Sequence, residues 1–181
     1  MVKYKRGNTT KLFKGQNMDK KICCFTGHRH ISNNDIQQLP QALESAISDL
    51  YALGVREFRT GGAIGFDTLA ALKVIAFRKN HPDVRLALIL PCRDQDSRWG
   101  RFDREIYQYT IECADSVIYT ENSYTLDCMH KRNRALVQNS DYCIAYLKKE
   151  DGGSAYTVNL AKRSGVSVIN LANAQDYQLK I

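Results

Sequence analysis

Short runs of apolar residues recur along the chain and alternate with longer segments in which apolar and polar residues are mixed. Continuous apolar runs of this length are typical of strands in a parallel sheet that is buried on both faces. The runs are residues 21–26, 55–59, 86–90, 116–119, 142–146 and 166–170. They predict a mostly parallel sheet of about six strands.

The segments between these runs have the spacing of amphipathic helices. In the first, apolar residues recur every three or four positions between Leu39 and Leu53, which places them on one helical face. Pro40 suits the first turn of that helix, and Gly54 suits its C-terminal end. Further helices are predicted at residues 68–79, 102–113, 126–138 and 155–163. Because strand and helix alternate, the fold class is α/β, an open sheet flanked by helices on both faces.

The length and composition favour one domain that folds around its own core. The chain has 181 residues, of which 44% are hydrophobic. It contains no apolar run near the roughly 20 residues of a membrane helix, and its first residues lack the apolar stretch of a signal peptide. We therefore expect a cytoplasmic protein with no membrane partner. The six cysteines include no C-x-x-C pair, which indicates free thiols and no metal site.

The formal net charge of +7 comes mainly from the N-terminus. Residues 1–17 hold five of the 26 basic residues and no acidic one, so the remainder has 21 basic against 19 acidic residues, a net of +2. A nearly neutral domain does not favour a large nucleic-acid interface, which needs clustered Lys and Arg. We interpret residues 1–17 as a disordered basic leader or a misassigned start, with a nucleic-acid-binding arm as the other option. Residues 18–181 are the predicted domain.

Glycines lie at two predicted strand-to-helix turns. Gly61, Gly62 and Gly65 follow the second predicted strand, and Gly152 and Gly153 follow the fifth. Glycine lets a backbone approach a ligand closely, and the helix that follows directs free N–H groups toward the turn. Such turns bind anions, most often the phosphates of nucleotides. Each could also be a simple tight connection, but two in one small domain favour a phosphate site.

Side chains near these turns add candidate contacts. Asp67 lies just inside the helix after the first turn, where it either caps free N–H groups or accepts a ribose hydroxyl. Ser154 and Thr157 supply hydroxyls beside the second turn. Each of these residues would lie at the carboxyl ends of the strands, where open α/β sheets bind their ligands.

Three further segments carry groups that suit an anion or a base. Gly27, His28 and Arg29 follow the first predicted strand, and the two side chains offer hydrogen-bond donors. Gln95 and Trp99 lie in the polar loop after the most apolar strand, where the Trp ring either stacks on a base or packs against the sheet.

The third segment is the basic start of the helix at residues 126–138. It holds Arg132 and Asn133, which share one helical face with Met129. The segment is either an anion clamp beside a phosphate turn or a solvated basic face.

Together these motifs resemble the YpsA-like branch of the SLOG superfamily. The resemblance covers residues 18 to about 171 and depends on the order and spacing of the motifs that begin at Thr26, Gly61, Pro91, Ala114, Arg132 and Gly152. The superfamily also includes the DNA-processing protein DprA/Smf and the "Lonely Guy" phosphoribohydrolases. The resemblance implies a Rossmann-like fold, a nucleotide or nucleotide-derived ligand, and relatives that often pair through helices as homo-oligomers.

The phosphoribohydrolases provide an instructive comparison. Their Met-His-x-Arg-Lys motif is similar to residues 129–133, with Asn133 in place of Lys, and it implies a catalytic and phosphate-binding role for Arg132. Their Pro-Gly-Gly-x-Gly-Thr-x-x-Glu motif is matched only in part from Asp151 onward. Asn159 or Leu160 stands where that family has Glu, and neither can transfer a proton at neutral pH. The phosphate cradle is retained and the catalytic carboxylate is missing.

The sequence therefore predicts a cytosolic binding protein or sensor for a nucleotide or nucleotide-derived phosphate ligand, with no firmly implied cofactor. One alternative is a nucleoside 5′-monophosphate phosphoribohydrolase in which another acid, such as Asp67, replaces the missing Glu. The second alternative is single-stranded DNA binding in the manner of DprA. The nearly neutral domain and its single Trp do not favour this alternative.

Overall fold

The computed structural model describes residues 20–172, and the predicted leader at residues 1–17 lies outside this range. Six strands form one sheet in the order β4-β3-β2-β1-β5-β6, and every neighbouring pair is parallel. The strands are β1 (Lys21–Gly27), β2 (Val55–Thr60), β3 (Arg85–Leu90), β4 (Ser116–Tyr119), β5 (Tyr142–Tyr146) and β6 (Ser167–Asn170). The helices are α1 (Leu39–Ala52), α2 (Phe66–Arg78), α3 (Arg101–Cys113), α4 (Cys128–Val137) and α5 (Gly152–Arg163). The predicted α/β class, Rossmann-like and flanked by helices on both faces, is confirmed.

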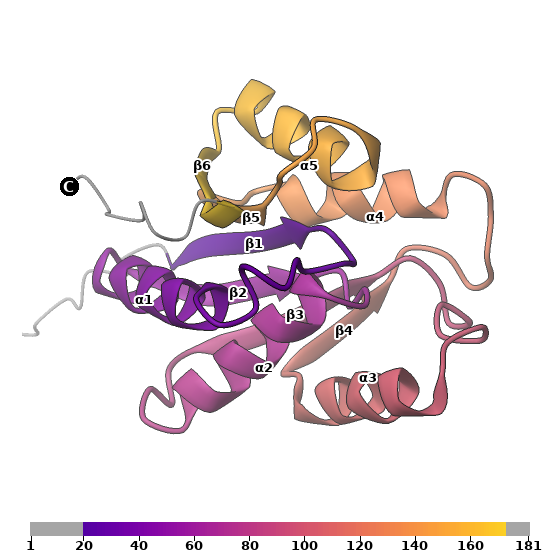
Figure 1. Cartoon of the computed structure of the whole chain (residues 1–181), viewed down its shortest axis with the longest axis horizontal. Helices are drawn as coiled ribbons and strands as arrows, with labels where there is room; N and C mark the ends of the chain where they lie inside the picture. Colours follow the sequence, from indigo (N-terminus) through magenta and orange to yellow (C-terminus); the bar gives the residue numbers. More distant parts are fainter. Residues whose placement is uncertain (1–19, 173–181) are drawn as a thin grey trace, which may run out of the picture.

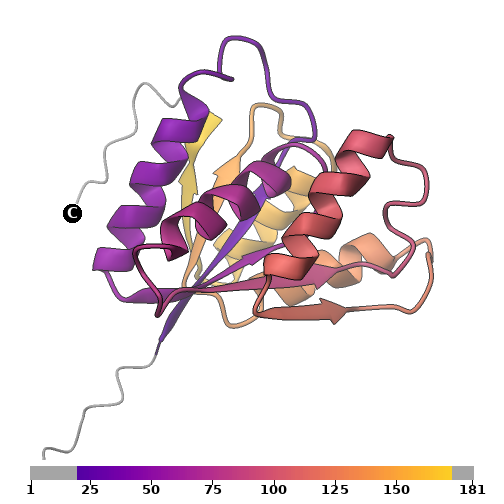
Figure 2. The ribbon, with the colours of Figure 1, turned by 90° about the horizontal axis from the view of Figure 1, so that it is seen from below.

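The strand order fixes where a ligand can enter. From β1 the chain builds outward through β2, β3 and β4, and it then returns to place β5 on the other side of β1. Helices α1, α2 and α3 cover one face of the sheet, and α4 and α5 cover the other (Figure 1). The view in Figure 2 shows the same two layers with the sheet between them. The side on which strands are added to the sheet thus switches between β1 and β5, and sheets of this type bind ligands at such a switch point.

Two apolar clusters hold these layers together. Under α1–α3, the larger cluster includes Leu43, Ile47 and Phe58, all fully buried. Under α4 and α5, the smaller cluster includes Cys24 and Cys143. Consecutive side chains of β1, β3 and β5 are buried on both faces of the sheet, which explains why these strands are continuous apolar runs and not alternating ones.

The helix boundaries follow local chemistry closely. Gly54 has φ +95° and follows Leu53, the C-cap residue of α1, which is the position where helices often end on glycine. Helix α5 begins at Gly152, three residues earlier than predicted, because the glycine pair forms its first turn and not the loop before it. Between residues 20 and 172, no helix has the length and apolar character needed to cross a membrane. The six cysteines lie in the same range as free thiols.

Candidate functional site

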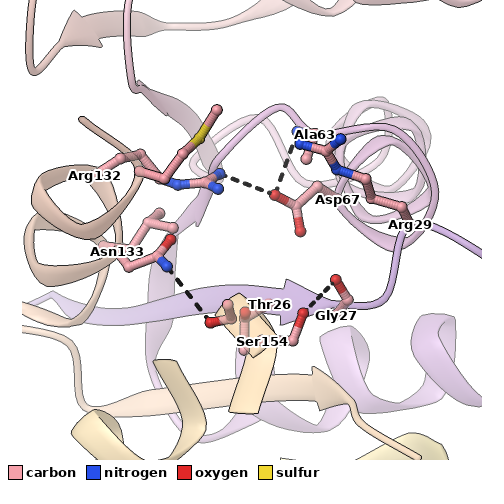
Figure 3. Close-up of a pocket in the computed structure, with 11 residues that line it drawn as sticks. Thr26, Gly27, Arg29, Ala63, Asp67, Arg132, Asn133 and Ser154 are labelled. Atoms are coloured by element: carbon pink, nitrogen blue, oxygen red, sulfur yellow. Dashed lines mark hydrogen bonds and ion pairs between the residues drawn. The ribbon is translucent and has the colours of Figure 1, made fainter. Parts of the chain in front are cut away.

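A cavity of about 350 Å³ opens at the carboxyl ends of the strands, beside the segments that follow β1 and β5. Four segments far apart in the sequence form its walls (Figure 3). They are the end of β1, the turn before α2, one face of α4 and the first turn of α5. The residues are Thr26, Gly27, Arg29, Ala63, Asp67, Met129, Arg132, Asn133, Leu136, Gly153 and Ser154.

A buried ion pair lies in the cavity wall. Arg132 on α4 donates from Nη1 to Oδ2 of Asp67 on α2 at 3.4 Å, and the two residues are 9% and 5% exposed. The backbone N–H of Ala63 donates to the same Oδ2 at 3.3 Å. Burial raises the pKa of Asp67, and the positive charge of Arg132 opposes that rise. Burial also lowers the pKa of Arg132, against the opposite effect of Asp67. Each charge therefore depends on the other.

The first glycine turn is shaped around this pair. A Cβ on Gly61 would lie 1.4 Å from Nη1 of Arg132, so only glycine lets the guanidinium reach Asp67. Gly65 has φ +88°, and a Cβ there would lie 2.1 Å from the carbonyl oxygen of Arg29. Asp67 accepts its hydrogen bond from the N–H of Ala63, which belongs to the turn and not to α2. The chain's own carboxylate thus occupies the turn that the sequence presented as an anion site, and Gly61, Gly62 and Gly65 do not line the cavity.

The second glycine turn does face the cavity. Gly153 and Ser154 line it, and among the described residues no side chain caps the start of α5. The first N–H groups of a helix have no acceptor within the helix, so they are available to a ligand. Ser154 donates its hydroxyl hydrogen to the carbonyl of Gly27 at 2.7 Å, which ties this turn to β1. Thr157 is fully buried and donates to the carbonyl of Gly153 at 2.8 Å, so it supports the turn from behind.

Arg132 also has a hydrogen-bond donor without a partner among the described residues. Its Nε is buried and has no hydrogen-bond partner within residues 20–172. Arg29 is exposed on the opposite wall of the cavity (Figure 3). Two guanidinium groups against one carboxylate give the cavity a net positive charge, which attracts an anion. Asn133 lies beside them and donates weakly to the carbonyl of Gly153, at 3.5 Å.

Some predicted site residues lie outside the cavity wall. Nε2 of His28 accepts hydrogen bonds from the backbone N–H groups of Lys148 and Lys149, at 2.9 and 3.2 Å. Gln95 donates to the carbonyl of Gly62 at 3.0 Å. The ring of Trp99 packs edge-on against Tyr107, with 5.1 Å between the ring centroids. These three side chains brace the loops around the site. Gly152 has φ +76° and precedes the cavity-lining part of its turn.

The wall also contains residues that the predicted site did not include. Thr26, Ala63, Met129 and Leu136 complete the lining. Met129 and Leu136 lie three positions before and four after Arg132, so helical spacing from the arginine was the signal that could have identified them. Thr26 was marked only as the start of a motif, and Ala63 has a small apolar side chain that no pattern in the sequence distinguishes.

Carboxylates are scarce in the wall of the cavity. Among the described residues that line the cavity, Asp67 has the sole carboxylate, and that group is committed to Arg132 and the turn. Neither Asn159 nor Leu160, the two alternatives for the position of the phosphoribohydrolase Glu, lines the cavity. The described residues include no group of three or more His, Cys, Asp or Glu side chains placed to hold a metal ion.

Comparisons of sequence show clear relatives. A UPF0398 protein of Halalkalibacterium halodurans is 31% identical over 153 residues, which cover 79% of this chain and 81% of the relative. A UPF0398 protein of Bacillus thuringiensis is 27% identical over 155 residues, covering 80% and 84%.

Comparisons of structure find DNA processing protein A. The proteins from Helicobacter pylori and Streptococcus pneumoniae match with a TM-score of 0.58 each, at 18% and 15% identity. Each match covers 82% of this chain but only 64% and 49% of the other, so this chain spans less than two thirds of either protein. At this identity the likeness concerns the fold. The model of the YspA SLOG family matches residues 23–176, and the chain belongs to that family.

Proposed function

We propose that this protein binds a nucleotide or nucleotide-derived ligand and that the ligand's phosphate occupies the cavity between α4 and α5. One observation carries the proposal: Arg132, whose buried Nε has no hydrogen-bond partner among the described residues, lines the same cavity as the uncapped N-terminus of α5. A helix N-terminus and a guanidinium are the two groups that bind phosphate most readily. An unpaired buried donor costs about 1–3 kcal/mol, which a bound oxyanion would recover.

The cavity suits one small molecule. Its volume of about 350 Å³ lies at the lower end of the range for small-molecule sites, roughly 300–1,000 Å³. The phosphate would lie against Gly153 and Ser154, and the rest of the ligand would extend toward Arg29 at the exposed rim. A mononucleotide-sized ligand fits this description better than a polymer.

Binding without turnover is the function that the wall supports best. Cleavage of an N-glycosidic bond needs a carboxyl group that exchanges a proton with the substrate. Asp67 has the sole carboxyl group among the described residues of the wall, and its ion pair with Arg132 opposes the uptake of a proton. A sensor or carrier of a phosphate-bearing ligand needs only the binding groups of this wall and no proton transfer.

The structural relatives motivate one comparison in the same experiment. The Helicobacter pylori protein is described with a single-stranded DNA binding mode, so an oligonucleotide belongs beside the mononucleotides as a test ligand. DNA binding would show a steep loss of affinity with added salt, because many phosphates release counterions. A site for one phosphate predicts a shallow dependence.

A panel of nucleoside mono-, di- and triphosphates tested by thermal shift and calorimetry examines the proposal. A ligand at 100 times its Kd should stabilise the protein by about 2.7 kcal/mol. Arg132→Met should weaken that ligand about 10- to 100-fold, the usual loss for a charged hydrogen bond. Arg134→Met is the matched control, since Arg134 is exposed on the same helix and outside the cavity. If no nucleotide binds, or if both variants weaken it equally, the proposal fails.

A further inference from the structure

We propose that neutral His28 holds the second glycine turn in its binding conformation and that protonation of His28 releases the turn. The inference builds on the phosphate site proposed above and assigns a regulator to it. It concerns a histidine that lies next to the site without lining it.

The backbone of His28 is fixed on both sides. Its N–H donates to the carbonyl of Tyr146 on β5 at 3.1 Å, and its carbonyl accepts from the N–H of Phe66 on α2 at 3.2 Å. The imidazole therefore starts from a defined position at the end of β1. From there Nε2 accepts from the N–H groups of Lys148 and Lys149, which begin the loop between β5 and α5.

This arrangement requires one protonation state. A nitrogen that accepts a hydrogen bond carries no hydrogen, so the single hydrogen of the neutral ring must be on Nδ1. In the imidazolium both nitrogens carry hydrogen and neither can accept. Protonation would therefore break both hydrogen bonds and direct an N–H group at two other N–H groups.

The loop that His28 holds leads directly into the phosphate-binding turn. Only a few residues separate Lys149 from Gly153 and Ser154. The far end of this segment is tied to β1 as well, through the hydrogen bond from Ser154 to Gly27. Two adjacent residues, Gly27 and His28, thus hold both ends of the segment. Loss of the His28 contacts leaves the backbone N–H groups of Lys148 and Lys149 without their acceptor, while the side chain of Lys148 remains paired with Asp35.

The charged groups around His28 keep their charge throughout the pH range in which histidines gain or lose a proton. The ammonium of Lys148 forms an ion pair with Oδ2 of Asp35 at 2.5 Å, and the hydroxyl of Tyr146 donates to the same oxygen at 2.6 Å. The hydrogen bonds from Lys148, Ser32 and Tyr146 lower the pKa of Asp35 to about 2. Asp35 is therefore ionised throughout the range of about pH 5 to 8 in which histidines titrate. The Tyr146 ring packs edge-on against the imidazole, and the side chains of Arg29 and His30 are exposed.

The test compares His28→Gln and His28→Ala, with His30→Gln as the control for loss of a nearby exposed histidine. The amide oxygen of Gln can reach the position of Nε2 and accepts at every pH, whereas Ala offers no acceptor. The first measurement is amide hydrogen exchange of Lys148 and Lys149 by NMR, from pH 8 to pH 5.5 and corrected for the intrinsic exchange rate. The second is the Kd of adenosine 5′-monophosphate over the same range.

We expect the corrected exchange of both amides to rise about five- to tenfold as wild-type His28 is protonated, the effect of losing two modest hydrogen bonds. His28→Ala should show the faster rate at every pH, His28→Gln the slower rate at every pH, and His30→Gln the wild-type profile. The ratio of the wild-type Kd to that of His28→Gln should rise toward acid pH. The ligand's own protonation is common to both proteins and cancels in this ratio.

Exchange that is the same in His28→Ala and wild type, or independent of pH in wild type, would overturn the inference. A constant Kd ratio would show that the turn's release does not reach the ligand and would overturn its regulatory part. If the wild-type protein binds no adenosine 5′-monophosphate, the proposed function fails for that ligand, and the exchange rates still decide whether His28 holds the turn.

Discussion

The ion pair between Arg132 and Asp67 gives the sharpest prediction for stability. Arg132→Met preserves much of the side-chain volume but leaves the buried carboxylate of Asp67 without its counter-charge. Removal of one partner of a buried pair usually costs about 3–5 kcal/mol. The 3.4 Å contact is long for a charged hydrogen bond, and Asp67 keeps its bond from Ala63, so we expect the lower end, about 3 kcal/mol.

The dependence of this loss on pH identifies its cause. Burial raises the pKa of Asp67, and removal of Arg132 removes the main opposing effect, so the pKa rises further in the variant. A carboxyl group with a higher pKa in the folded state takes up a proton on folding. Its contribution therefore favours folding at acid pH and is lost as the pH rises from about 4, the value in the unfolded chain, through the folded value. The deficit of Arg132→Met should be largest at neutral pH and should shrink toward pH 4.

Urea unfolding at several pH values measures this deficit, and a double-mutant cycle with Asp67→Asn isolates the pair. The double variant removes both charges, so its loss should fall short of the sum of the single losses by about 2 kcal/mol. Arg134→Met, exposed on the same helix, should change stability by no more than about 0.5 kcal/mol. Additive losses, or a deficit that stays constant with pH, would refute a charge interaction between the two side chains.

Three further predictions concern the first glycine turn and Asp35. Gly65→Ala should destabilise by about 3 kcal/mol in urea unfolding, because its Cβ would meet a backbone carbonyl oxygen at 2.1 Å; Gly54→Ala, with a similar φ of +95° and open space, should lose only about 1–2 kcal/mol. Gly61→Ala should displace Arg132 and weaken nucleotide binding in calorimetry as much as Arg132→Met does; unchanged affinity would contradict the steric argument. Asp35, with its pKa lowered to about 2, should stabilise the fold above about pH 4 and lose that contribution between about pH 4 and 2; Asp35→Asn should abolish this part of the acid unfolding curve.

Much of the fold could be predicted from the sequence because its causes are local. Strands buried on both faces need continuous apolar runs, and helices need a repeating apolar face, so both patterns are present along the chain. Gly54 marked the end of α1 because the left-handed conformation there favours glycine whatever the rest of the fold does. The order of the motifs was enough to identify the family, which the family model confirms.

The roles of the site residues were decided by partners that only the tertiary structure brings together. Asp67 and Arg132 are 65 positions apart, and they form an ion pair in the folded chain. The first glycine turn therefore makes room for the side chain of Arg132, because a Cβ on Gly61 would collide with it. His28 had the chemistry of a ligand donor in the sequence, but 120 positions further on the chain supplies two N–H groups that make it an acceptor. A sequence shows which groups can form hydrogen bonds, whereas the packing of distant segments determines which of those groups are already satisfied. The second turn remains available to a ligand because, within the described chain, no side chain caps it.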